Sequence, residues 1–149
     1  MKLLAVALLA AVLSMVVGTD TSRVEDEKAV RRAVLDYVEA FYESKPELWK
    51  RGVHPELAKF GFWRAEGAAE YERLPFDYEQ GLEFCATYNA DGHVPADAPK
   101  DVAVLDLLDR IATVKLTAEW GIDYMHLARF EDEWKIVQVV WQSHPPKGE

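Results

Sequence analysis

The stretch from Trp120 to Trp141 limits the possible folds of this chain more than any other part of it. In it, two runs of alternating apolar and polar residues lie on either side of a short acidic segment, Glu131 to Glu133. Alternation with a period of two, in runs rich in β-branched and aromatic side chains, is typical of β-strands. The sequence therefore predicts a β-hairpin here, and the rest of the chain is interpreted as strands that extend its sheet or helices that cover it.

Three further segments have the length and composition of strands. Val102 to Leu108 and Ile111 to Ala118 are separated by Asp109-Arg110, which is expected to form a two-residue turn. A strand is also predicted from Leu57 to Trp63, where Gly61 indicates a bend or the close approach of another group. In the segment that ends at Ala118, the apolar side chains share one face that we expect to be buried: Ala112, Val114, Leu116 and Ala118.

The longest helix is predicted from about Arg23 to Tyr42. A capping box formed by Ser22 and Glu25 is expected to begin it. Its apolar residues recur at intervals of three and four, as a helix with one buried face requires: Val30, Ala33, Val34, Tyr37, Val38 and Phe41.

Two shorter helices follow in the sequence. Ser44 and Glu47 form a second capping box, and Asp77 with Gln80 forms a third. Cys85 lies on the apolar side of the helix that begins at the third box. It is the only cysteine, so no internal disulfide can form, and we expect a buried structural thiol rather than a reactive one.

The first 18 residues have the pattern of a secretory signal peptide. Lys2 precedes an unbroken apolar run, Leu3 to Leu13, and Gly18 offers a small residue for cleavage before Thr19. We therefore predict a protein that is secreted or periplasmic. An uncleaved anchor, or an apolar helix retained in the fold, remains as an alternative, although the apolar segment is shorter than the roughly 20 residues of a spanning helix.

Residues 19–149 are expected to form a single domain, with a core between about residues 24 and 144. Half of the 149 residues are apolar, which is enough for an ordinary core. The net charge of −9 argues against a nucleic-acid partner, and against a membrane partner after the signal is cleaved, because phosphate would be repelled. Since no pair of histidines has ligand spacing, neither a metal site nor a cofactor is predicted.

The order of these elements, together with several short motifs, resembles a known family. The motifs are His54-Pro55, then Val104-Leu-Asp106 followed by Ile111-Ala112, and Asp123-Tyr124 with Trp134-Lys-Ile-Val. Over Glu27 to His144 they are similar to the putative lumazine-binding (SnoaL-like) branch of the nuclear transport factor 2 (NTF2)-like superfamily. The resemblance implies an α+β cone, in which a curved antiparallel sheet wraps around the long N-terminal helix and encloses a central pocket. It does not imply a ligand, because members include isomerases, dehydratases, cyclases, hydrolases and non-enzymatic binders.

The register of the hairpin decides which side chains face this pocket. If Phe130 pairs with Trp134, the pocket face carries Tyr124, His126 and Gln138. The opposite face, with Met125, Leu127, Val139 and Trp141, is then the outer face. The resemblance implies that this outer face forms the surface of a homodimer. A slip of one residue would turn Tyr124, His126 and Gln138 out and bring Asp123 in.

The leading hypothesis is a domain that binds a small aromatic or apolar molecule in a pocket lined by Tyr37, Phe41, Trp63, Tyr124, His126 and Gln138. In the alternative interpretation, His126 and Gln138 only satisfy each other's hydrogen bonds. A second hypothesis is an isomerase, dehydratase or hydrolase with a pocket acid/base, for which the candidates are His54, His126, Asp123 and Asp106. A third is a dimeric accessory domain whose cavity is simply core.

Overall fold

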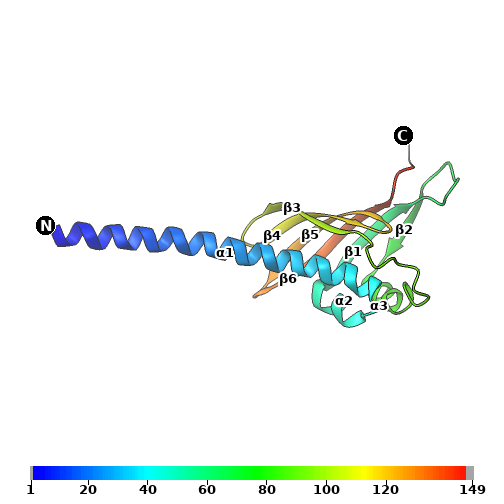
Figure 1. Ribbon diagram of the computed structural model, residues 1–149, viewed down its shortest axis with the longest axis horizontal. Coiled ribbons are helices and arrows are strands. Elements are labelled where there is room, and N and C mark those ends of the chain that lie inside the picture. Colours follow the sequence, from blue (N-terminus) through cyan, green and yellow to red (C-terminus); the bar gives the residue numbers. More distant parts are fainter. Residues whose placement is uncertain (1, 147–149) are drawn as a thin grey trace.

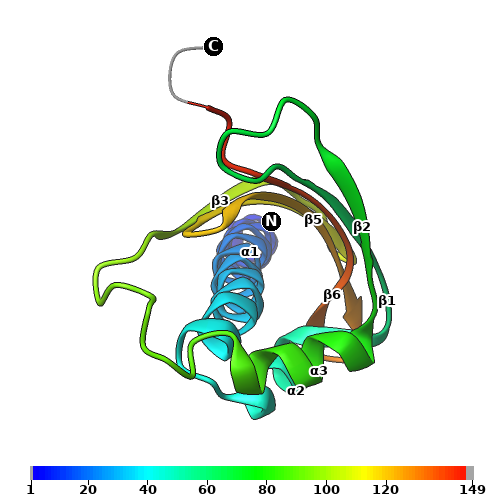
Figure 2. The ribbon, with the colours of Figure 1, turned by 90° about the vertical axis from the view of Figure 1, so that its right-hand side faces the viewer.

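A curved sheet of six strands, formed within residues 2–146, wraps around one long helix (Figures 1 and 2). The computed structural model describes residues 2–146, with side chains from residue 21 onward. In chain order the elements are α1 (Lys2–Tyr42), α2 (Pro46–Gly52), β1 (Val53–Trp63), β2 (Glu72–Phe76), α3 (Tyr78–Thr87), β3 (Lys100–Leu107), β4 (Ile111–Ala118), β5 (Gly121–Phe130) and β6 (Glu133–Ser143). The predicted α+β cone around an N-terminal helix is confirmed.

The strands lie in the order β2-β1-β6-β5-β4-β3. Neighbouring strands are antiparallel except β1 and β6, which run parallel within the described chain. The prediction of a wholly antiparallel sheet is therefore wrong at one pair, because β1 lies beside β6 and runs in the same direction. Figure 2 shows α2 and α3 below α1, across the open side of the curved sheet.

The predicted pairing of Phe130 with Trp134 is wrong by one residue. Arg129 lies opposite Trp134 and Phe130 lies opposite Glu133, so the turn has two residues instead of three. Glu131 in this turn has a φ of 55°, the left-handed conformation that a tight hairpin turn requires. As a result, the side chains of β5 face the opposite way from the prediction.

A β-bulge in β6 changes the facing of a second set of side chains. Leu127 pairs with Ile136 whereas His126 pairs with Gln138, which leaves Val137 as an extra residue on β6. Trp134 and Ile136 therefore face α1, as predicted, but Gln138 after the bulge faces outward.

The inner face of the sheet is the apolar core against α1. The predicted inner residues of β4 are all buried, which confirms that strand: Ala112, Val114, Leu116 and Ala118. Met125, Leu127 and Val139 are also buried, at 1%, 1% and 0% exposure. The face that was predicted to be a homodimer surface is therefore packed inside the cone, and the prediction of that face is wrong.

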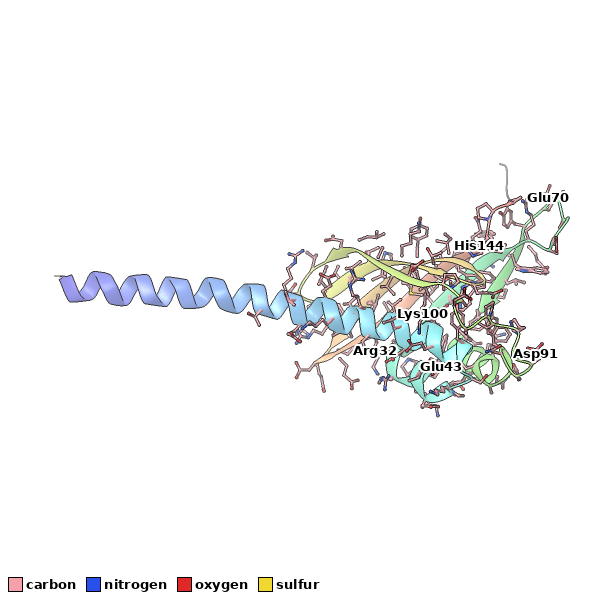
Figure 3. The ribbon with its side chains drawn as sticks, viewed as in Figure 1. Arg32, Glu43, Glu70, Asp91, Lys100 and His144 are labelled. Atoms are coloured by element: carbon pink, nitrogen blue, oxygen red, sulfur yellow. The ribbon has the colours of Figure 1, made fainter. Side chains whose placement is uncertain are left out.

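Polar contacts fix the position of α1 against the sheet. Lys100, labelled in Figure 3, reaches α1 from the start of β3, and its Nζ lies 2.7 Å from Glu39 Oε1. At the other end of the sheet, Arg129 Nη1 and Trp134 Nε1 donate to Asp26 Oδ1 at 3.1 and 3.2 Å. These contacts hold the helix at both ends of the curved surface that it fills.

Two of the three predicted capping boxes are wrong. Ser22 lies inside the continuous helix α1, whereas a capping residue needs a non-helical backbone. Ser44 has a φ of 52° and leaves Lys45 as the N-cap of α2, without a side-chain cap hydrogen bond. The third box is confirmed, since Asp77 and Gln80 bond each other's backbone amides at 2.8 Å and begin α3.

The predicted signal peptide, residues 1–18, lies outside the residues whose side chains are described. Among residues 21–146, whose side chains are described, no helix is both long enough and apolar enough to cross a membrane. Cys85 of α3 is fully buried, as predicted, and burial raises the pKa of its thiol to about 12.

Candidate functional site

A cavity of about 740 Å³ opens between the sheet and the helices, beside α3. Most of the side chains that line it are aromatic or otherwise apolar, and two of them, Lys59 and Glu119, are charged. The lining residues are Phe41, Lys59, Trp63, Leu74, Pro75, Phe76, Phe84, Tyr88, Glu119, Trp120 and Trp141. This volume lies within the usual range for small-molecule sites.

Gly61 allows one wall of this cavity to form. The indole of Trp141 on β6 lies directly over Gly61 on β1, and a Cβ at Gly61 would be only 2.1 Å from Trp141 Nε1. The predicted close approach of another group to Gly61 is thus confirmed. The Trp141 ring therefore lies over β1, where it forms part of the pocket surface.

Lys59 is the cation that faces the cavity. Its Nζ donates to the hydroxyl of Tyr37 at 2.5 Å. Burial lowers the pKa of Lys59 to about 8, although the negative charge of Asp123 acts in the opposite direction. The ammonium also lies over four aromatic rings, at 4.3 to 5.9 Å from their centroids: Phe76, Tyr37, Phe41 and Trp141.

Asp123 is the buried anion behind the cavity wall, with 0% of its surface exposed. Its Oδ2 accepts from the Tyr37 hydroxyl at 2.8 Å, and its Oδ1 accepts from Trp120 Nε1 at 2.8 Å. Burial raises the pKa of Asp123, and Lys59 and the two donors oppose that rise. Burial and then the charge of Asp123 raise the pKa of Tyr37. The three groups form one hydrogen-bonded chain, from Lys59 through Tyr37 to Asp123.

Glu119 is the second charged group of the cavity lining. Tyr88 donates its hydroxyl to Glu119 Oε2 at 2.6 Å, and the backbone amide of Glu119 donates to the Tyr42 hydroxyl at 2.7 Å. Burial raises the pKa of Tyr42 to about 12, and burial followed by the bond to Glu119 raises the pKa of Tyr88. Both phenols therefore stay protonated and act as hydrogen-bonding groups at neutral pH.

The structure places some of the predicted pocket residues at the cavity. Phe41 and Trp63 line it, and Tyr37 is buried next to Lys59. Asp123 faces inward, as a slip of one residue in the hairpin would require.

Other predicted pocket residues are on the outer face of the sheet. Tyr124 is 53% exposed, and His126 and Gln138 are exposed as well, so their predicted facing is wrong. The cause is the two-residue turn for Tyr124 and His126, and the bulge at Val137 for Gln138. His126 Nδ1 and Gln138 Oε1 lie 2.7 Å apart, so the two side chains do pair, at the surface and not in the core.

The remaining acid/base candidates, His54 and Asp106, are not among the residues that line the described cavity. His54 stacks on Phe130 with ring centroids 4.3 Å apart, and its Nδ1 accepts from the Glu56 amide at 3.2 Å. Asp106 is exposed and accepts from the backbone amide of Leu107 at 2.9 Å. These contacts indicate local structural roles for both side chains.

Lys59 and Glu119 are the charged side chains that line the cavity, and neither is among the residues predicted from the sequence. Alternation along β1 places Lys59 on the same face as Leu57 and Trp63. A single cation on an apolar strand face was therefore the one sequence feature that could have indicated Lys59 as a pocket residue. Glu119 lies in the β4–β5 turn, for which no pattern predicts a pocket. Among residues with described side chains, no cluster of three or more His, Cys, Asp or Glu could hold a metal ion.

Comparisons with known proteins agree with this architecture. A sequence model of the family described as "Putative lumazine-binding" matches residues 25–142. No curated protein is significantly similar in sequence to the chain.

Solved structures similar to the chain include an NTF2-like protein of unknown function from Silicibacter pomeroyi, with a TM-score of 0.60 and 18% identity, over 80% of this chain and 97% of that one. Another, of unknown function from Methylobacillus flagellatus, has a TM-score of 0.59 and 16% identity, over 82% and 94%. A putative scytalone dehydratase from Novosphingobium aromaticivorans has a TM-score of 0.50 and 14% identity, over 88% and 98%. At these identities the likeness shows the fold.

Proposed function

The chain belongs to the family described as "Putative lumazine-binding", within the NTF2-like proteins, and on that premise we propose that its pocket binds a small planar aromatic molecule. Membership of this family suggests small-molecule binding. The observation that carries the finer proposal is the cavity of about 740 Å³, walled by aromatic rings and containing an ammonium and a carboxylate.

Two of the aromatic rings at the cavity are incompletely covered by the protein itself. Trp63 is 44% exposed and Phe84 is 43% exposed, although both line the cavity. A flat ligand that stacks on them would remove this apolar surface from water, and ring pairs add about 0.5–1.5 kcal/mol beyond the area that they bury. Lys59 would pair with an acceptor oxygen of the ligand, and Glu119 would accept from an N–H or O–H group.

Neighbouring residues on β1 provide a matched test of ligand binding. Trp63 and Phe62 have similar exposure, 44% and 37%, but only Trp63 lines the cavity. We expect Trp63→Ala to weaken binding of flavin-like and other planar aromatic compounds by about threefold to tenfold, because one stacked ring pair is lost. Phe62→Ala should leave affinity unchanged. Titration calorimetry measures both, and equal affinities for Trp63→Ala and the wild type would contradict the proposed site.

Native mass spectrometry of the protein purified from its own host would identify a retained ligand. A mass increase that disappears on denaturation is the expected result. Protein that is recovered free of ligand and binds none of the flavin-like and other planar aromatic compounds would refute this function.

An acid/base enzyme is the second candidate function, and the chain of Lys59, Tyr37 and Asp123 favours it. In such an enzyme Lys59 would exchange a proton with the substrate, because it is the member of the chain that lines the cavity. Lys59→Met should then abolish turnover of a substrate that still binds. A binding protein without activity would show ligand affinity but no product by mass spectrometry.

We also propose that residues 1–18 are removed on export to the periplasm or the medium, on the basis of their sequence pattern. The N-terminal sequence of the protein recovered from its host tests this cleavage. A homodimer through the outer sheet face is a further proposal, supported by the exposed side chains of Tyr124 and Phe62 there. Light scattering should report a dimer that Tyr124→Glu converts to a monomer.

A further inference from the structure

We propose that Lys59 captures carbonyl compounds as imines, so that the ligands of this pocket include aromatic aldehydes or ketones held covalently. This inference rests on the proposed binding function and adds a covalent step to it.

The amine of Lys59 lies at the cavity lining among aromatic rings. Its Nζ lies within 6 Å of four ring centroids, of which Phe76 at 4.3 Å is the nearest. A planar carbonyl compound that stacks on these walls would bring its carbonyl carbon to this nitrogen. Among the described residues, the hydrogen-bond partner of Lys59 is a neutral hydroxyl, Tyr37, so the ammonium is not locked in a direct ion pair.

A proton path leads from this amine to the interior. Lys59 donates to Tyr37, and Tyr37 donates to Asp123 Oδ2. If the ammonium proton moves to the Tyr37 oxygen while the Tyr37 proton moves to Asp123, a neutral amine, a neutral phenol and a carboxylic acid result. Burial favours these neutral forms, because it lowers the pKa of Lys59 and raises that of Asp123.

Imine formation then needs no reagent other than the amine and the carbonyl compound. The lone pair of Lys59 Nζ forms a bond to the carbonyl carbon, and the π electrons of the carbonyl move to its oxygen, which takes up a proton. The nitrogen loses its remaining protons as the hydroxyl leaves as water and the C=N bond forms. One water is released for each imine, and nothing is oxidised or reduced. Tyr37 and Asp123 pass the protons between these stages.

The nearby thiol does not compete for the carbonyl group. Cys85 interacts electrostatically with Lys59, but it is fully buried and its pKa is raised to about 12, so it stays protonated. A thiol is a much weaker nucleophile than a thiolate. Lys59 is therefore the reactive nucleophile that the cavity presents.

Reductive trapping tests this assignment. The full chain is incubated at pH 7 with 2-naphthaldehyde and sodium cyanoborohydride, whose hydride converts the imine into a stable secondary amine, and peptide mass spectrometry locates the adduct. We expect Lys59 to be labelled at least about 100-fold faster than Lys115 on the outer face, because lowering the pKa of Lys59 from the ordinary 10.5 to about 8 raises its fraction of free amine at pH 7 about 300-fold. Lys59→Met and Lys59→Arg should both lose the adduct, and Lys115→Met should keep it.

A second probe distinguishes a pocket that binds ligands without forming an imine from a pocket that binds no ligand. 2-Naphthalenemethanol has the same ring without a carbonyl group, and its binding is measured by quenching of tryptophan fluorescence. If it binds but the aldehyde labels Lys59 no faster than Lys115, the imine is refuted and the binding function stands. If the alcohol does not bind and Lys59 is not labelled preferentially, both proposals are refuted. Circular dichroism of Lys59→Arg shows whether lost labelling reflects lost folding.

Discussion

Replacing Asp123 with Asn tests whether the buried carboxylate controls the ionisation of Lys59. Hydrogen bonds of 2.5 and 2.8 Å link Lys59 to Asp123 through the Tyr37 hydroxyl, so the two charges are about 5 Å apart at most. At an effective dielectric constant of about 20, two unit charges at this distance attract by about 3 kcal/mol. Since about 1.4 kcal/mol corresponds to one pKa unit, the pKa of Lys59 should fall from about 8 to about 6.

The substitution preserves the volume and most of the hydrogen bonding of the site. The Asn amide oxygen can accept from Trp120 Nε1, and its amide nitrogen can donate to the Tyr37 oxygen. Competitive labelling with trace acetic anhydride from pH 5 to 10, followed by peptide mass spectrometry, reports the titration of each amine. Lys115 serves as the internal reference. Asp106→Asn is the charge-matched control, because Asp106 lies outside the cavity and its loss should leave the Lys59 curve unchanged.

An unchanged midpoint for Lys59 in Asp123→Asn would refute this reasoning, provided that thermal unfolding shows the fold to be intact. It would mean that the charge of Asp123 does not reach Lys59 through Tyr37. The same shift in Asp106→Asn would also refute it, because a nonspecific loss of negative charge would then explain the result.

Three further predictions concern stability. Gly61→Ala should cost about 1–3 kcal/mol in urea unfolding, because the new Cβ would lie 2.1 Å from Trp141 Nε1; an equal cost in a Trp141→Leu background would contradict this contact. The pKa of Lys59 is about 8 in the folded protein, below its ordinary 10.5, so between these pH values the unfolded chain binds the proton and the folded protein does not. The stability of the wild type relative to Lys59→Met should therefore rise from pH 8 to 10.5. A stability difference that does not change in that window would argue against the lowered pKa. Asp77→Ala should cost about 0.5–2 kcal/mol, because Asp77 caps α3, whereas Asp97→Ala in an exposed loop should be neutral.

The parts of the fold that the sequence predicts well are those where one face is clearly apolar. β4 has the predicted bounds and inner face, because strict alternation and a turn on its N-terminal side leave one register. The start of α3 is also as predicted, because both partners of the Asp77 capping box are present in the sequence and bonded in the structure.

The hairpin shows why the site could not be predicted equally well. Glu131 adopts a positive φ that sequence patterns assign to Gly or Asn, so the two-residue turn carried no recognisable signature. The bulge at Val137 lies in a run of β-branched residues that suit either face of a strand. Each feature reverses the facing of part of the hairpin. The turn exchanges Tyr124 and His126 for Asp123 on the inner face, and the bulge turns Gln138 outward.

Lys59 shows a different limit. Alternation along β1 separates Lys59 and Trp63 from Phe60 and Phe62, but both sets contain aromatic rings. The sequence therefore defines the two faces of the strand without saying which one is inside. That choice depends on β6, which pairs with β1 from the far end of the chain.

The parallel pairing of β1 with β6 has a consequence for the order of folding. β3, β4, β5 and β6 are joined by short turns, so their contacts are local and are expected to form early. Val53 of β1 lies opposite Ile136 of β6, and closing that long loop has a larger entropic cost. Because the wall that carries Lys59 and Trp63 is expected to be added by this late step, we predict that the pocket is absent from the folding transition state. A bound ligand should therefore slow unfolding and leave the folding rate unchanged.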